Sequence, residues 1–201
     1  MTKIDFPILD TEHFRQYCLS CHSENINRIF EEGRTYYLCS SCKTKSPRLL
    51  VIDPAVVWWI DKQTKEYWHE SVGAFINNGE GKVLFFERTI WEFAFTIPAG
   101  HLDSGEKPDA AVKREIAEEV GVELEKVDVF SREQVIGDRC RRGADDHLWN
   151  LYKASIKKNQ KIVVNDEGFR PAWLTKDEAL GKDLTFAARY FIEKYGDSLF
   201  E

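Results

Sequence analysis

Short runs of apolar, β-branched and aromatic residues recur along most of the chain, and they predict a protein rich in strands. The expected strands cover residues 49–60, 67–76, 83–86, 93–98, 127–136, 147–156 and 170–174. The sequence Asn-Asn-Gly-Glu-Gly at 77–81 separates two of these runs and predicts a tight hairpin. Polar segments with turn-forming residues separate most of the others.

Helical periodicity is confined to three places. The clearest follows Pro108, where Val112, Ile116 and Val120 are spaced four apart and predict a buried stripe. Proline suits the first turn of a helix, and Gly121 is a typical helix end. Shorter helices are expected at 175–180 and 184–195. Strands flanked by helices in this way predict an α/β sandwich around a mixed sheet.

The chain has 201 residues, of which 43% are hydrophobic, enough for one full core and a small accessory unit. Its formal net charge of −6 gives no general attraction for nucleic acid or anionic lipid. The first ten residues lack the apolar run of a signal peptide. The apolar run at 56–60 is too short to cross a membrane. We therefore expect a soluble cytoplasmic protein with neither a membrane nor a nucleic acid as its partner.

Three carboxylates stand out within the main helix. Glu115, Glu118 and Glu119 follow i, i+3, i+4 spacing and share one face, where their mutual repulsion would weaken the helix. A divalent cation would convert this repulsion into coordination, and hard oxygen ligands suit Mg²⁺ or Mn²⁺. The alternative is a solvated charged face. The surrounding residues favour the metal site, because Arg114 lies one turn before Glu118 and can orient the carboxylates.

The whole segment from Gly100 to Val122 resembles the Nudix box, Gly-x5-Glu-x7-Arg-Glu-U-x-Glu-Glu-x-Gly-U, where U is aliphatic. Every fixed position of that motif is matched. The resemblance implies a Nudix α/β/α sandwich that hydrolyses a nucleoside diphosphate linked to another group with Mg²⁺ or Mn²⁺. It also implies that Glu106 pairs with Arg114, that the carbonyl of Gly100 is a metal ligand, and that a homodimer is possible. The catalytic set is then Arg114, Glu115, Glu118 and Glu119, in which Glu118 or Glu119 could position the attacking water.

Two further groups are candidates for substrate chemistry. Many Nudix proteins carry a glutamate that binds metal or activates water in a loop before a late strand, and Glu167 occupies such a position. Arg139, Arg141 and Arg142 form a dense basic cluster between two predicted strands. Because arginine forks match phosphate oxygens, we expect a diphosphate clamp there. The alternative for both groups is an ordinary solvated loop.

The first fifty residues carry a separate motif. Cys18, Cys21, Cys39 and Cys42 form two Cys-x2-Cys pairs with the spacing of a four-thiolate zinc site. The segment between the pairs predicts a β-hairpin, as in a zinc ribbon. Disulfides and a redox pair are the alternatives, of which disulfides fit poorly with a reduced compartment. Four thiolates leave no open position, so the zinc would be structural. Cys140 is left over and is expected to be an ordinary free thiol.

These features predict a zinc ribbon at residues 1–48 and a Nudix hydrolase domain at 49–201. The arrangement resembles zinc-ribbon Nudix pyrophosphatases that cleave NADH, FAD or ADP-ribose. Residues 131–137 differ from the motif that NADH pyrophosphatases carry after the box, and no proline lies between Pro108 and Pro171. The substrate within this class therefore stays open. The alternative function is a nucleotide-sensing or RNA-associated module with a silent Nudix domain.

Overall fold

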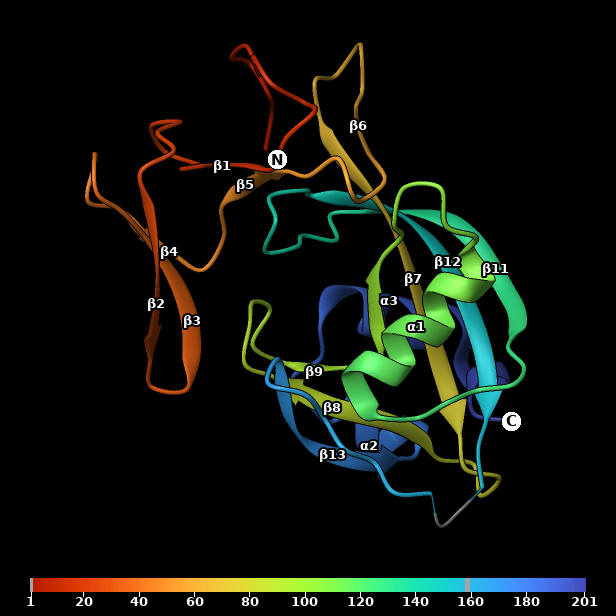
Figure 1. Ribbon diagram of the computed structural model, residues 1–201. Coiled ribbons are helices and arrows are strands. Elements are labelled where there is room, and N and C mark those ends of the chain that lie inside the picture. Colours follow the sequence, from red (N-terminus) through yellow and green to blue (C-terminus); the bar gives the residue numbers. More distant parts are fainter. Residues whose placement is uncertain (1, 158–159) are drawn as a thin grey trace.

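A mixed sheet forms the centre of the computed structural model, which describes residues 2–157 and 160–201 (Figure 1). Its main strands follow the order β11-β12-β7-β8-β13, and three shorter strands pair with β7 or β8. Their bounds are β6 (Trp58–Ile60), β7 (Tyr67–Asn77), β8 (Val83–Arg88), β9 (Phe95–Thr96), β10 (Ala99–His101), β11 (Asp128–Ile136), β12 (Asp146–Ser155) and β13 (Gly168–Leu174). β12 runs parallel to β7, whereas the other pairings are antiparallel.

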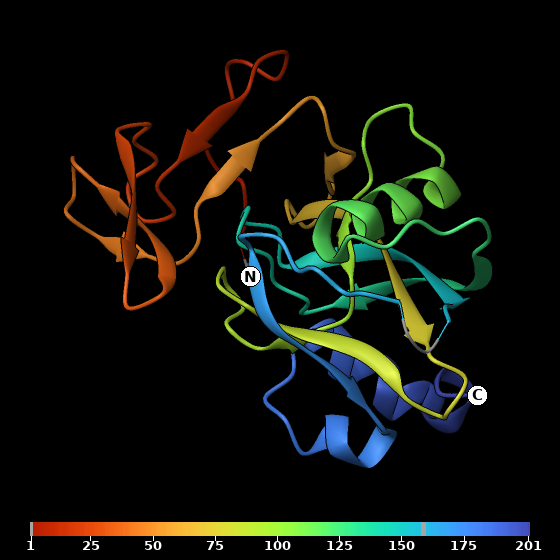
Figure 2. The ribbon, with the colours of Figure 1, turned by 60° about the horizontal axis from the view of Figure 1, so that its bottom comes forward.

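Helices cover both faces of this sheet (Figures 1 and 2). α1 (Pro108–Val120) packs on one face, and α2 (Lys176–Leu180) and α3 (Phe186–Tyr195) pack on the other. Every residue of β7 is buried, with Val72, Ala74 and Ile76 on the α1 side and Phe75 on the α3 side. This alternation follows from the two-residue repeat of a strand. The predicted α/β sandwich around a mixed sheet is confirmed.

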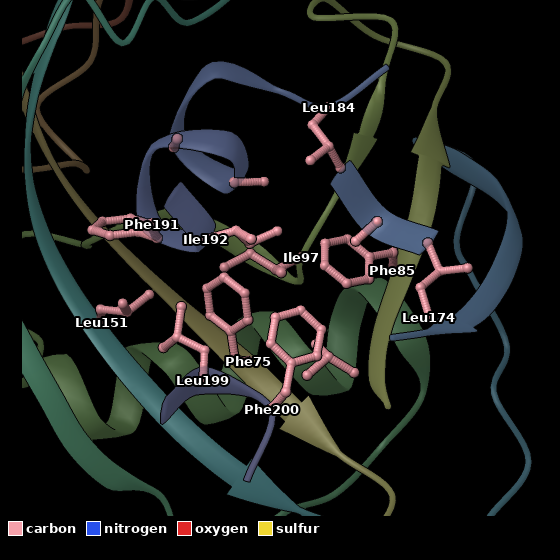
Figure 3. Packing of buried hydrophobic residues seen from close by; sticks show 14 of the residues in the cluster. Phe75, Phe85, Ile97, Leu151, Leu174, Leu184, Phe191, Ile192, Leu199 and Phe200 are labelled. Carbon is pink, nitrogen blue, oxygen red and sulfur yellow. The ribbon is translucent and has the colours of Figure 1, made fainter. Parts of the chain in front are cut away.

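The core on the α3 side is built from large aromatic and branched side chains (Figure 3). Phe75, Phe85 and Phe191 are completely buried there. Burial of one such side chain stabilises the fold by roughly 1.5–3 kcal/mol. The one-turn 3₁₀ helix η1 (Gly196–Leu199) closes this core at the C-terminal end, where Leu199 and Phe200 are also buried.

The helix ends follow the sequence closely. α1 begins after Lys107, which makes no side-chain capping bond, and ends at Gly121 in the left-handed conformation with φ 67°. Glycine adopts that conformation without the strain that a Cβ would bring. α2 begins with a capping box, in which the Thr175 hydroxyl accepts a hydrogen bond from the Glu178 backbone and the Glu178 carboxylate accepts one from the Thr175 backbone.

The N-terminal segment forms two small sheets beside the sandwich (Figure 2). β2 (Ile26–Glu31), β3 (Arg34–Cys39) and β4 (Lys45–Ser46) form a three-stranded sheet, so the hairpin predicted between the cysteine pairs is confirmed. β1 (Arg15–Tyr17) pairs with β5 (Leu50–Ile52). Strand pairing therefore joins residues on the two sides of position 48, the predicted end of the zinc ribbon.

Three elements differ from the prediction. The strand expected at 49–60 is split into β5 and β6, because the Asp53 side chain accepts a hydrogen bond from Ala55 and Pro54 between them has no N–H for a strand ladder. The strand expected at 93–98 is reduced to β9. In the helix expected at 184–195, Phe186 at the start of α3 is 42% exposed, whereas Ala187, Ala188, Phe191 and Ile192 are buried against the sheet. Within the described ranges, no helix has the length and apolar character needed to cross a membrane.

Candidate active site

The box loop and α1 bring Gly100 of β10 into close contact with Glu115. A Cβ built on Gly100 would overlap all three atoms of the Glu115 carboxyl group. Glycine is therefore required here by the close approach of the carboxylate. This contact places the Glu115 carboxylate directly against Gly100.

Arg114 connects the parts of the box. Its guanidinium donates to Glu106 at 2.9 and 3.2 Å, which confirms the predicted pair between these residues. It also donates to Glu115 at 2.8 Å and to Glu118 at 3.3 Å. The hydrogen bond to Glu106 and the neighbouring carboxylates raise the pKa of Arg114 against the effect of burial. One guanidinium thus orients two of the three helix glutamates.

The three glutamates lie at different depths. Glu119 is 8% exposed and accepts a hydrogen bond of 2.7 Å from the Ala99 N–H, whereas the Glu118 side chain is 59% exposed. Burial raises the pKa of Glu119 well above its ordinary value and raises that of Glu115, and the charges of neighbouring carboxylates raise both further. A divalent cation would favour the charged forms instead. The donors fit the expected ion, because carboxylate and carbonyl oxygens are the ligands of Mg²⁺ and Mn²⁺.

The glutamates open onto a cavity of about 370 Å³ that also reaches the two later candidate segments. Gly100, Arg114, Glu115, Glu118, Glu119, Arg141, Arg142 and Glu167 all line it. Arg141 donates to the Glu167 carboxylate at 3.2 Å and to the Tyr37 hydroxyl of β3 at 3.1 Å. Arg142 pairs with Asp53 at 2.7 Å. The structure therefore brings two of the predicted arginines and the predicted loop glutamate to the box.

Arg139 lies elsewhere. It lines two other hollows, its side chain is 53% exposed, and its Nε is 4.0 Å from the Asp145 carboxylate. The turn between β11 and β12 thus directs Arg139 away from the box cavity.

The four N-terminal cysteines converge as their spacing predicts. Their sulfur atoms all lie within 4.8 Å of one another. Cys18 Sγ is 3.6 Å from Cys42 Sγ, and Cys21 Sγ is 3.6 Å from Cys39 Sγ. A disulfide needs about 2.05 Å, whereas sulfurs of a tetrahedral zinc site with Zn–S bonds near 2.3 Å lie roughly 3.8 Å apart. The arrangement fits a metal ion and not a pair of disulfides.

A second convergent group was not expected from the sequence. His69, His101, Cys140 and His147 also offer one donor atom each within 4.8 Å of the others, and we refer to them as the His₃Cys cluster. Cys140 Sγ is 3.6 Å from His69 Nδ1, so the expectation of an ordinary thiol is wrong. Burial acts to raise the pKa of the Cys140 thiol, but the adjacent His69 and His147 hold it well below its usual range. The available sequence signal was weak: His69 and His147 are polar residues within two predicted strands that are rich in apolar and aromatic residues.

The sequence is similar to a known family model and to curated proteins. A family model described as the NUDIX domain matches residues 67–195. An RNA pyrophosphohydrolase of Hydrogenovibrio crunogenus is 40% identical over 96 residues, which cover 48% of this chain and 56% of the relative. The chain thus spans little more than half the length of this curated relative, and 35% of that of a second RNA pyrophosphohydrolase, from Methylococcus capsulatus.

Solved structures share the sandwich. A MutT NUDIX hydrolase from Burkholderia pseudomallei matches with a TM-score of 0.54 at 26% identity, covering 64% of this chain and 98% of its own. The NUDIX domain of Shewanella oneidensis NrtR, complexed with ADP ribose, matches with a TM-score of 0.56 at 20% identity, covering 69% and 93%. The second likeness concerns the fold alone.

Proposed function

The chain belongs to the Nudix family, and we propose that it is a Mg²⁺- or Mn²⁺-dependent pyrophosphatase acting on nucleoside diphosphate derivatives of the ADP-ribose, NADH or FAD class. One observation carries the proposal. The box glutamates, Glu167 and two arginines line the same cavity, so groups for holding a cation, handling a proton and binding phosphate lie together. A solvated charged face would not need such convergence.

The residues present divide the work of hydrolysis. The Gly100 carbonyl with Glu115, Glu118 and Glu119 would hold the cation, which when bound lowers the pKa of water and neutralises charge on the diphosphate. Arg114 keeps the carboxylates in position. The partly exposed Glu167 lines the same cavity, where it can accept the proton that the attacking water loses.

Arg141 and Arg142 supply positive charge for a diphosphate in a cavity that is also lined by several carboxylates. Each is already paired with a carboxylate, at 3.2 Å to Glu167 and 2.7 Å to Asp53. These pairs hold the guanidinium groups in place before substrate arrives, and each arginine keeps further N–H donors for phosphate oxygens. Arg139 does not line this cavity, so we leave it out of the clamp.

We further propose that Cys18, Cys21, Cys39 and Cys42 bind a structural zinc ion in a ribbon at residues 1–48, followed by the Nudix domain at 49–201. The sulfur separations support this assignment. The ribbon contacts the lining of the cavity through Tyr37, whose hydroxyl accepts a hydrogen bond from Arg141. Its role is therefore to stabilise one wall of the site.

A hydrolysis screen tests the proposal. The protein is incubated with ADP-ribose, NADH, FAD or 5′-triphosphorylated RNA, with Mg²⁺, with Mn²⁺ or with chelator, and the products are separated by chromatography. We expect metal-dependent release of a mononucleotide from at least one of the first three compounds. Glu118→Gln should abolish it, and Glu123→Gln, an exposed glutamate just beyond α1, should not. Turnover of RNA alone would overturn the substrate class, and no turnover of any compound would favour a silent binding module.

A further inference from the structure

The His₃Cys cluster is assembled by the topology of the sheet. His147 of β12 is the direct partner of His69 in the parallel register, and β10 pairs along the other edge of β7. The ring centroids of His69 and His101 are 4.7 Å apart, and those of His69 and His147 are 5.6 Å apart. Cys140 joins them from the turn between β11 and β12. Three adjacent strands and one turn thus each contribute a donor.

Two members of the cluster are buried, the other two are partly buried, and the group is incompletely hydrogen bonded. His69 is 0% exposed and His147 is 2% exposed. In the part of the chain that the structure describes, the Nε2 atoms of His69 and His101 are shielded from solvent and have no hydrogen-bond partner. A buried polar atom left without a partner costs about 1–3 kcal/mol. A bound ion would satisfy the Nε2 atom of His101, whereas His69 would coordinate through Nδ1, the nitrogen that faces Cys140.

We propose that the His₃Cys cluster binds a second zinc ion. The 3.6 Å between Cys140 Sγ and His69 Nδ1 equals the edge of a zinc tetrahedron with one sulfur and one nitrogen ligand, about 3.6 Å for standard bond lengths. Imidazole and thiolate are the donors that zinc accepts, whereas Mg²⁺ and Ca²⁺ take oxygen. The site is thus chemically distinct from the glutamate site at the box.

The surroundings of His147 match those of a metal-binding histidine. Its Nδ1 donates to the Asp138 carbonyl at 2.7 Å and lies 3.2 Å from the Asp138 carboxylate. Trp149 Nε1 fixes that carboxylate with a hydrogen bond of 2.7 Å. These contacts hold the proton on Nδ1 and leave Nε2 free to coordinate, as carboxylate partners do for zinc-bound histidines.

Four protein donors close the coordination shell, so the ion is structural. Its position nevertheless matters for the active site. His101 follows Gly100, and Cys140 directly precedes Arg141 and Arg142. A zinc ion in the cluster would therefore tie the strand that carries the box glycine to the turn that carries the phosphate-binding arginines. The assignment holds whichever nucleotide is the substrate.

Zinc analysis of the full chain tests this proposal. We expect about two zinc ions per wild-type chain, one lost in Cys39→Ser and the other in Cys140→Ser after dialysis against a chelator. His13→Ala, which removes an exposed histidine outside the cluster, should keep both. X-ray absorption of the wild type needs no variant to fold, and it should show a mixed shell of sulfur and nitrogen. The zinc that remains in Cys39→Ser should be coordinated mainly by nitrogen.

Two results would overturn it. The first is a single zinc per wild-type chain with a sulfur-only shell that Cys39→Ser removes. The second is a Cys140→Ser protein with wild-type zinc content and an unchanged absorption spectrum. If instead the ribbon assignment is wrong, Cys39→Ser leaves the zinc content unchanged while Cys140→Ser lowers it, so the two sites are judged separately.

Discussion

Replacing Gly100 with alanine should impair catalysis without removing any catalytic group. A Cβ at this position would overlap the whole Glu115 carboxyl group, whose atoms are the three nearest to it. The carboxylate is the mobile end of a side chain, so it can retreat, and the fold should remain stable. To reach ordinary contact distance it must move by about 1 Å, and a misplacement of that size lowers a rate by roughly a hundredfold. This corresponds to about 2.7 kcal/mol of transition-state stabilisation.

Two assays measure this effect. Steady-state kinetics at saturating Mg²⁺ should show the drop in kcat, and titration with Mn²⁺ followed by electron paramagnetic resonance should show weaker binding even before a substrate is known. Gly181→Ala is the matched control, because Gly181 is in the right-handed helical region and its added Cβ would meet only ordinary contacts at 3.5 Å. Unchanged kcat and Mn²⁺ affinity in Gly100→Ala would refute the placement of Glu115 at the metal.

Three further outcomes are expected. Glu119→Gln should lower kcat roughly a thousandfold, about 4 kcal/mol of transition-state stabilisation. The same change should stabilise the metal-free protein against urea, because a neutral amide still accepts the Ala99 N–H without the penalty of a buried charge. Wild-type activity in this variant would contradict the metal site. Arg141→Ala should raise KM about tenfold through a lost phosphate contact, whereas Arg139→Ala should leave KM unchanged. An equal change of KM in the two variants, measured from Michaelis–Menten curves, would contradict the clamp. Burial raises the pKa of Glu92 from 4.5 to about 7, so its neutral form contributes stability below pH 4.5 that is lost as the pH rises through 7. In urea denaturation, Glu92→Gln should therefore gain about 3 kcal/mol over wild type at pH 8 and little at pH 4.5, and a gain that does not vary with pH would refute this.

Local patterns predicted the parts of the structure that local geometry determines. The spacing of Glu115, Glu118 and Glu119 is enough to place them on one helix face, and the close spacing of each cysteine pair is enough to form a knuckle. The end of α1 at Gly121 follows from the conformation that this residue alone adopts freely. Each of these features depends on residues a few positions apart.

Features that depend on tertiary contacts were not predictable. The burial of Glu119 arises from its contact with Ala99 of another element, and the separation of Arg139 from Arg141 arises from the course of a turn. The His₃Cys cluster escaped notice because its members belong to four segments and no motif joins them. An inward-facing histidine at 69 or 147 is a weak signal alone, since a buried histidine can be satisfied in many ways.

Cleavage in ¹⁸O-labelled water tests the central claim most directly. A mixture of ADP-ribose, NADH and FAD is incubated with the zinc-loaded protein and saturating Mg²⁺ or Mn²⁺, and the phosphate products are examined by mass spectrometry. The proposed function predicts that one product phosphate gains a single ¹⁸O atom, only when the divalent cation is present and not with Glu118→Gln. Intact substrates after prolonged incubation with both cations, or equal labelling by Glu118→Gln, would contradict hydrolysis at the box cavity.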